Sequence, residues 1–121
     1  MEVVVVLGAS KDSSRYSYKA LEMLGEHGHK VIPVHPHEKE IQGLRVVSKL
    51  EELVGQKIDT VTVYVNPNIS TQFEDALLKL SPKRVIFNPG AENSELSERL
   101  SQNGIKVEDA CTLVLLRTGQ Y

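Results

Sequence analysis

The sequence has no tryptophan, a single cysteine and only 5% aromatic residues. One cysteine, Cys111, excludes an internal disulfide framework, so we expect a reducing, cytoplasmic setting. No apolar run is long enough to span a bilayer. The opening Met1–Leu7 lacks the basic segment of a signal peptide and is interpreted as a strand. We therefore expect no membrane association.

A strong charge of either sign is also missing. The 14 Lys and Arg residues face 16 Asp and Glu residues, for a net charge of −2. Without a concentrated basic face or many aromatic rings for base stacking, nucleic-acid binding is not expected. The length of 121 residues and the 40% hydrophobic content indicate a single globular domain over residues 1–121.

Short runs rich in β-branched residues alternate with amphipathic segments. The predicted strands are Val3–Leu7, Val31–Val34, Val61–Val65, Val85–Phe87 and the weaker Ile105–Val107. The predicted helices contain Tyr18 to Leu24 before Gly28, a short segment after a capping box at Ser48–Glu51, a second after a capping box at Thr71–Glu74, and Ser94–Gln102. Continuous apolar strands of this kind are typical of parallel sheets covered on both faces.

This alternation predicts an α/β, Rossmann-like, doubly wound fold. It would have a mostly parallel five-stranded sheet with helices on both faces, in three layers. Two segments are less defined: Ala110–Arg117 suits a helix or a strand, and the polar connection His35–Arg45 is expected to be the least ordered.

The sharpest local signal is a loop between the first strand and the first helix. Its candidate anion-binding residues are Gly8, Ala9, Ser10, Lys11, Ser14 and Arg15. Such a loop can aim backbone N–H groups and the positive end of a helix dipole at a phosphate. The pattern departs from G-x-G-x-x-G, because Ser10 and Ser13 stand at the second and third glycine positions. An ordinary strand-to-helix turn is the alternative.

The end of the second strand narrows the class of ligand. An acidic residue normally binds the NAD ribose there, but this chain has Val34, His35 and Pro36, with no carboxylate before Glu38. A histidine tolerates a phosphorylated ribose that a carboxylate would repel. The residues at the end of the second strand therefore favour coenzyme A (CoA) or NADP over NAD as the ligand.

Several motifs in this order carry a wider resemblance. They are Gly8-Ala9-Ser10, Arg15-Tyr16-Ser17-Tyr18, Gly28 to Pro36 with its Val-Ile-Pro-Val-His-Pro, Glu40 to Gly43, Tyr64 to Pro67, Asn88 to Ala91, and Glu108 to Cys111. The chain resembles the small stand-alone CoA-binding domain proteins, a family similar to the N-terminal domain of the succinyl-CoA synthetase alpha subunit. His35 stands where that family usually has asparagine.

The resemblance implies a CoA or acyl-CoA site at the carboxyl ends of the strands. The phosphates would contact Gly8 to Lys11 and Arg15. The adenosine end would lie by Val34, His35 and Pro36. The crevice would be lined by Tyr64, Val65 and Asn66 and closed by Asn88, Pro89 and Gly90. It implies binding competence without an established reaction. The alternatives are an NADP-dependent oxidoreductase, or a subunit of one, and an interaction protein that has lost the ligand. The protein partner would be a second copy of the chain, forming a homodimer through the last helix and residues 117–121, or an acyl-CoA enzyme.

Other candidate groups have simpler explanations. The four histidines His27, His29, His35 and His37 lack further ligands nearby, so no metal site is predicted. Cys111 is followed by an apolar run and is expected to be a buried, inert thiol rather than a nucleophile. No acid/base pair or triad emerges, so no catalytic residue is assigned. Tyr18 either packs in the core or reaches a phosphate.

Overall fold

The computed structural model describes residues 1–121. In chain order the elements are β1 (Val3–Leu7), α1 (Tyr16–Glu26), β2 (Lys30–Val34), β3 (Glu40–Ile41), β4 (Leu44–Arg45), the 3-10 turn η1 (Leu50–Leu53), β5 (Thr60–Val63), α2 (Pro67–Ser70), the 3-10 turn η2 (Thr71–Phe73), α3 (Glu74–Leu80), β6 (Arg84–Phe87), α4 (Ser94–Gln102), β7 (Lys106–Asp109) and α5 (Thr112–Arg117). The main sheet has five parallel strands in the order β2-β1-β5-β6-β7.

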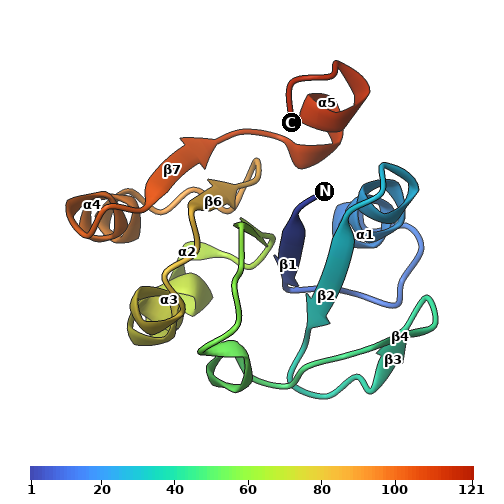
Figure 1. The fold of residues 1–121 in the computed structure, drawn as a ribbon, viewed down its shortest axis with the longest axis horizontal. Helices are drawn as coiled ribbons and strands as arrows, with labels where there is room; N and C mark the ends of the chain where they lie inside the picture. Colours follow the sequence, from blue (N-terminus) through green and yellow to red (C-terminus); the bar gives the residue numbers. More distant parts are fainter.

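Helices cover both faces of this sheet (Figure 1). On one face α1 and α5 bury Leu21, Leu24 and Leu116 against Val4 and Val6. On the other face η1, α3 and α4 form the larger core. Its residues include Leu50, Leu53, Leu77, Leu80, Leu96 and Leu100, packed against Val5, Leu7, Val61, Val63, Val85 and Phe87. The alternating residues of β1 thus enter opposite cores, which confirms the predicted doubly wound, three-layer fold.

The segment Ala110–Arg117, left open between helix and strand, ends in helix α5. The connection His35–Arg45 is more ordered than expected, because it contains the hairpin β3–β4. Gln42 and Gly43 turn this hairpin with positive φ angles of 53° and 76°, as a two-residue primed turn requires. Ile41 is buried in the core beside α1. That burial anchors a loop whose sequence is mostly polar.

The capping box predicted at Ser48–Glu51 does not form. The Ser48 hydroxyl donates to the Glu52 carboxylate at 2.7 Å, and Lys49 caps η1 without any side-chain hydrogen bond. The segment is a short 3-10 turn that buries Leu50 and Leu53. The prediction was wrong because a hydroxyl can bond a nearby side chain as readily as a backbone N–H group.

The capping box predicted at Thr71–Glu74 is also wrong. The chain is already helical from Pro67, and the Asn66 side chain caps α2 by accepting from the Ile69 N–H at 3.1 Å. The Thr71 hydroxyl donates to the Pro67 carbonyl at 2.9 Å. An asparagine followed by proline is the N-terminal signal that the sequence actually carried here.

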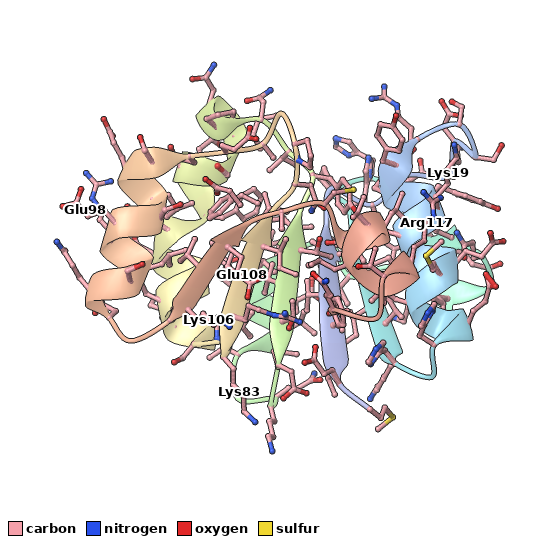
Figure 2. The ribbon with its side chains drawn as sticks, turned by 90° about the horizontal axis from the view of Figure 1, so that it is seen from above. Lys19, Lys83, Glu98, Lys106, Glu108 and Arg117 are labelled. Carbon is pink, nitrogen blue, oxygen red and sulfur yellow. The ribbon has the colours of Figure 1, made fainter.

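Charged residues join the amino ends of the strands. Arg84 lies between Glu2 and Glu108, at 3.5 and 3.8 Å. Lys106 contacts Glu108 at 3.1 Å, and Figure 2 shows both of these residues on β7. The Arg84 guanidinium also lies 4.5 Å from the centre of the Tyr121 ring. These contacts hold Tyr121 close to Glu2, which precedes the first strand.

Candidate ligand-binding site

The strand order reverses direction between β1 and β5. Helix α1 leaves β1 toward one face, and α2 and α3 leave β5 toward the other. A crevice therefore opens at the carboxyl ends of these two strands, where open α/β sheets bind ligands. The structure has a cavity of about 540 Å³ at this point, here called the first cavity. Its lining residues are Leu7, Gly8, Ala9, Ser10, Arg15, Tyr16, Ser17, Val34, His35, Pro36, Ser48, Tyr64, Val65, Ile69, Phe73 and Pro89.

Ten of the sixteen predicted site residues thus lie together around one cavity. The other six do not line it: Lys11, Ser14, Tyr18, Asn66, Asn88 and Gly90. Tyr18 belongs to α1 and packs, partly buried, against the core on that face of the sheet, Asn66 caps α2, and the Gly90 N–H donates to Glu92 at 2.9 Å. These three contacts are structural.

Asn88 has a structural role as well. Its amide donates to the Thr62 hydroxyl at 2.7 Å and to the Val63 carbonyl at 3.0 Å, while its oxygen accepts from the Thr112 N–H at 2.9 Å. Thr62 and Thr112 also share a hydrogen bond at 2.8 Å. This buried group ties the start of α5 to the sheet.

Glycine is required at the start of the phosphate loop. Gly8 has a φ of +89°, and a Cβ atom there would lie 2.8 Å from Val65 Cγ1. A side chain would therefore strain the backbone and would collide with Val65, in the segment that follows β5. The close approach of the loop to Val65 forms the floor of the first cavity.

The backbone donors of the loop differ from the expectation. The N–H groups of Gly8 and Ala9 both donate to the Val34 carbonyl at 3.2 Å, so they anchor the loop to β2. The unpaired donors lie further along, at Ser10, Lys11 and Ser13 in the loop and at the start of α1. The N–H groups of Tyr16, Ser17 and Tyr18 have no partner within the protein. The backbone donors free to meet an anion are therefore those of Ser10, Lys11, Ser13 and the first turn of α1, rather than those of Gly8 and Ala9.

The N-cap of α1 leaves that turn open. Arg15 occupies the N-cap in an extended conformation and makes no side-chain cap hydrogen bond, and the first turn holds no acidic residue. Tyr16 and Ser17, the first two helical residues, line the cavity. An external anion would satisfy donors that the sequence leaves uncapped.

Both cations near the loop contact carboxylates of the chain. Lys11 Nζ lies 3.5 Å from Glu38, and Arg15 Nε lies 3.9 Å from Asp12. The Ser14 hydroxyl, which donates to Asp12 at 2.7 Å, lowers the pKa of that carboxyl. Both cations are largely exposed, so a phosphate can replace their carboxylate partners at small cost.

His35 is held in one tautomer. Its Nδ1 accepts from the backbone N–H groups of His37 and Glu38, each at 3.0 Å. An acceptor at Nδ1 places the proton of the neutral ring on Nε2. In the family that the sequence resembles, asparagine usually occupies this position, and its side-chain oxygen can accept the same kind of turn hydrogen bond. Histidine keeps that acceptor and presents a donor beside the cavity as well.

Tyr64 forms the wall between the first cavity and a second cavity of about 340 Å³. Burial raises the pKa of Tyr64 to about 12, so the phenol is neutral at physiological pH. Its oxygen lies near the Thr62 and Thr112 hydroxyls without a well-formed hydrogen bond. The second cavity is lined by Tyr16, Lys19, Tyr64, Asn88, Pro89, Cys111, Leu113, Val114 and Arg117.

Six lining residues were not among the predicted site residues: Leu7, Tyr16, Ser17, Ser48, Ile69 and Phe73. For Tyr16 a signal existed. Helical spacing places Tyr18 on the same face as Leu21, in the core, which leaves Tyr16 at the open end of the helix. Leu7 ends the predicted first strand, next to the loop. Ser17 follows Tyr16 in the first turn of α1. Ser48, Ile69 and Phe73 reach the cavity through packing between segments far apart in the chain.

Three further sequence predictions concern metal ligands, membrane spans and the single cysteine. No group of three or more His, Cys, Asp or Glu side chains is placed to hold a metal ion; His35 and His37 lie edge to face with ring centres 6.0 Å apart. None of the helices combines the length and apolar character needed to cross a bilayer. The prediction that Cys111 is buried was wrong: it is only partly buried, because it lines the second cavity, and it has no disulfide partner.

The fold and cavity together define a doubly wound α/β protein with a cavity at its topological switch point, the place where proteins of this class bind ligands. The family model of the CoA binding domain matches residues 2–117, and the chain belongs to this family. This membership confirms the resemblance inferred from the motifs.

Individual relatives agree with this assignment. The alpha subunit of the ADP-forming acetate–CoA ligase II of Pyrococcus furiosus is 33% identical over 63 residues, which are 51% of this chain. The chain covers only 14% of that subunit. The uncharacterized protein YneT of Bacillus subtilis is 28% identical over 92% of this chain and 82% of its own length. A crystal structure of an uncharacterized protein superposes with a TM-score of 0.94 at 44% identity, covering 100% of this chain and 98% of that one.

Proposed function

We propose that this protein binds CoA or an acyl-CoA in the first cavity and that its role is binding rather than catalysis. The observation that carries the proposal is the uncapped start of α1, which opens into a cavity at the switch point of the sheet. The pyrophosphate would accept hydrogen bonds from the free N–H groups of Tyr16 and Ser17 and would contact Arg15.

The adenosine end would lie toward the end of β2. Val34, His35 and Pro36 line that side of the cavity, and no Asp or Glu does. The Nε2–H group of His35 is a donor suited to a phosphate or a ring nitrogen. Glu38 contacts Lys11 instead of lining the cavity. A ribose phosphate is therefore tolerated at this end, as CoA requires.

The lining also supports a binding role. The first cavity contains no carboxylate and no cysteine, so neither a pair of acid/base carboxylates nor a thiol nucleophile lines it. Its titratable side chains are those of Arg15, Tyr16, His35 and Tyr64. The phenol of Tyr64 is buried and neutral.

Thermal unfolding with added ligands tests this proposal. CoA at about a hundred times its Kd should stabilise the native state by about 2.7 kcal/mol, which is roughly a 10 °C rise in Tm. Arg15→Gln should weaken CoA binding about fivefold. Lys79→Gln, which removes a charge from an exposed position on α3, should leave CoA binding unchanged. A shift with NADP and none with millimolar CoA would favour the oxidoreductase alternative and overturn the proposal.

A further inference from the structure

The second cavity adjoins the first. It contains two cationic side chains, those of Lys19 and Arg117, whereas the first contains one, that of Arg15. The two cavities share Tyr16, Tyr64 and Pro89 in their linings. A ligand that leaves the start of α1 along these residues enters the second cavity without crossing the core. In an extended CoA molecule, the part beyond the pyrophosphate is the pantetheine arm with its thioester.

Two cations flank the second cavity. Lys19 comes from α1 and Arg117 from the last residue of α5, and Figure 2 shows them on the same side of the molecule. Neither forms an ion pair with an Asp or Glu of the chain, and no carboxylate lines this cavity. Lys19 lies over the Tyr16 ring, 5.6 Å from its centre. The cavity is therefore an electropositive site with no counter-charge from the chain itself.

The remaining wall is apolar. Leu113 is buried and Val114 is half exposed, and both belong to the same short helix as Arg117. A site with an apolar wall and a cationic rim fits a short alkyl chain that ends in an anion. The guanidinium can bind a carboxylate through two parallel hydrogen bonds, and the lysine adds a point charge.

We propose that the second cavity receives the acyl end of a CoA thioester, and that Lys19 and Arg117 favour acyl groups ending in a carboxylate. This inference rests on the proposed function, because the nucleotide end must occupy the first cavity. It names a ligand class, the ω-carboxyacyl-CoA thioesters, that family membership alone does not select.

The affinity of two stable thioethers tests this selectivity. S-(3-carboxypropyl)-CoA and S-butyl-CoA carry the same four-carbon chain and differ in a terminal carboxylate against a methyl group. We expect the carboxylated ligand to bind the native protein about three- to tenfold more tightly by calorimetry. The double variant Lys19→Gln/Arg117→Gln should remove the difference. Lys30→Gln/Lys79→Gln, which removes the same charge from exposed positions outside both cavities, should preserve it.

Cys111 reports occupancy of the second cavity independently. It is the only thiol in the chain and lines this cavity, so its alkylation by iodoacetamide can be followed by mass spectrometry. S-(3-carboxypropyl)-CoA should slow the alkylation several-fold. Adenosine 3′,5′-bisphosphate, which lacks the pantetheine arm, should leave the rate unchanged.

The outcomes separate the two proposals. Equal affinity for the two thioethers, or an alkylation rate that the carboxylated ligand does not change, would overturn the acyl selectivity while leaving CoA binding in place. If neither thioether nor CoA itself binds, the proposed function fails, and the acyl site fails with it.

Discussion

Gly8 is the residue at which backbone conformation and the candidate site depend on each other most directly. Its positive φ permits the turn out of β1, and its missing side chain permits contact with Val65. Elsewhere in the chain a glycine with positive φ serves a turn alone. Gly55, with a φ of +96°, provides that comparison, because a Cβ atom added there would meet no other atom within 4 Å.

Gly8→Ala should lower the free energy of unfolding by about 2–4 kcal/mol, since it adds backbone strain and a collision with Val65. CoA affinity should fall at least tenfold, because the floor of the first cavity must move. Gly55→Ala should cost only about 1–2 kcal/mol of strain and leave binding unchanged. Urea denaturation and calorimetry measure both effects. Equal losses in the two variants would show that the contact with Val65 is unimportant.

Tyr64→Phe tests a second residue of the site. The phenol oxygen is buried without a well-formed hydrogen bond, so its removal should stabilise the free protein by about 1 kcal/mol. CoA affinity should stay the same, because the ring remains as the wall between the cavities. Tyr64→Ala, which deletes that wall, should destabilise the protein and weaken binding. A large loss of affinity in the phenylalanine variant would mean that the hydroxyl contacts the ligand.

Among the elements, α5 is the one most dependent on a single side chain. It has six residues, too short to be stable without tertiary contacts. The buried group formed by Asn88, Thr62 and Thr112 connects it to β5 and β6. The same helix supplies Leu113, Val114 and Arg117 to the second cavity.

Asn88→Ala should therefore cost about 2–4 kcal/mol of stability, because it leaves buried partners unsatisfied. The loss should concentrate in α5, so hydrogen exchange at its amides should accelerate more than at those of α3. Asn103→Ala, which removes an exposed amide that donates to the Arg99 carbonyl at 2.8 Å, is the matched control and should change little. Uniform acceleration over the whole chain would argue against a local anchor.

At the scale of the whole molecule, Asp59 links acid stability to the sheet. Its carboxylate accepts from the Val3 N–H at 2.8 Å and lies 3.4 Å from Lys83 Nζ. The hydrogen bond from Val3 lowers the pKa of Asp59. Because the folded-state pKa lies below the unfolded value, the stabilisation is complete above about pH 4 and declines as the pH falls through the folded value.

Asp59→Ala should lower the free energy of unfolding by about 1–3 kcal/mol at neutral pH. The difference from the native protein should shrink as the pH falls below about 4, since the native carboxyl then becomes protonated as well. Glu98→Ala on α4, which removes an exposed carboxylate that forms no ion pair, should show no such pH-dependent difference. Urea titrations over this pH range measure the effect, and a constant difference would contradict it.

Periodicity was sufficient to predict most elements. The run Val3–Leu7 was predicted as a strand and Ser94–Gln102 as a helix, and the structure has both with the same bounds. Short-range spacing alone places such residues on faces, which is why these predictions were confirmed. The capping predictions failed, because a cap depends on which backbone donors remain unpaired after the chain has folded.

The sequence by itself determined the class of this protein: the alternation of elements, the glycine after the first strand, and the CoA-binding family that its motifs resemble. Only the tertiary structure decided which donors are free for a ligand. Gly8 and Ala9 donate to Val34, far along the chain, whereas the first N–H groups of α1 stay unpaired. The tertiary structure also brings Lys19 and Arg117 to one cavity. Such pairings come from sheet order and helix packing between distant segments, which local spacing does not encode.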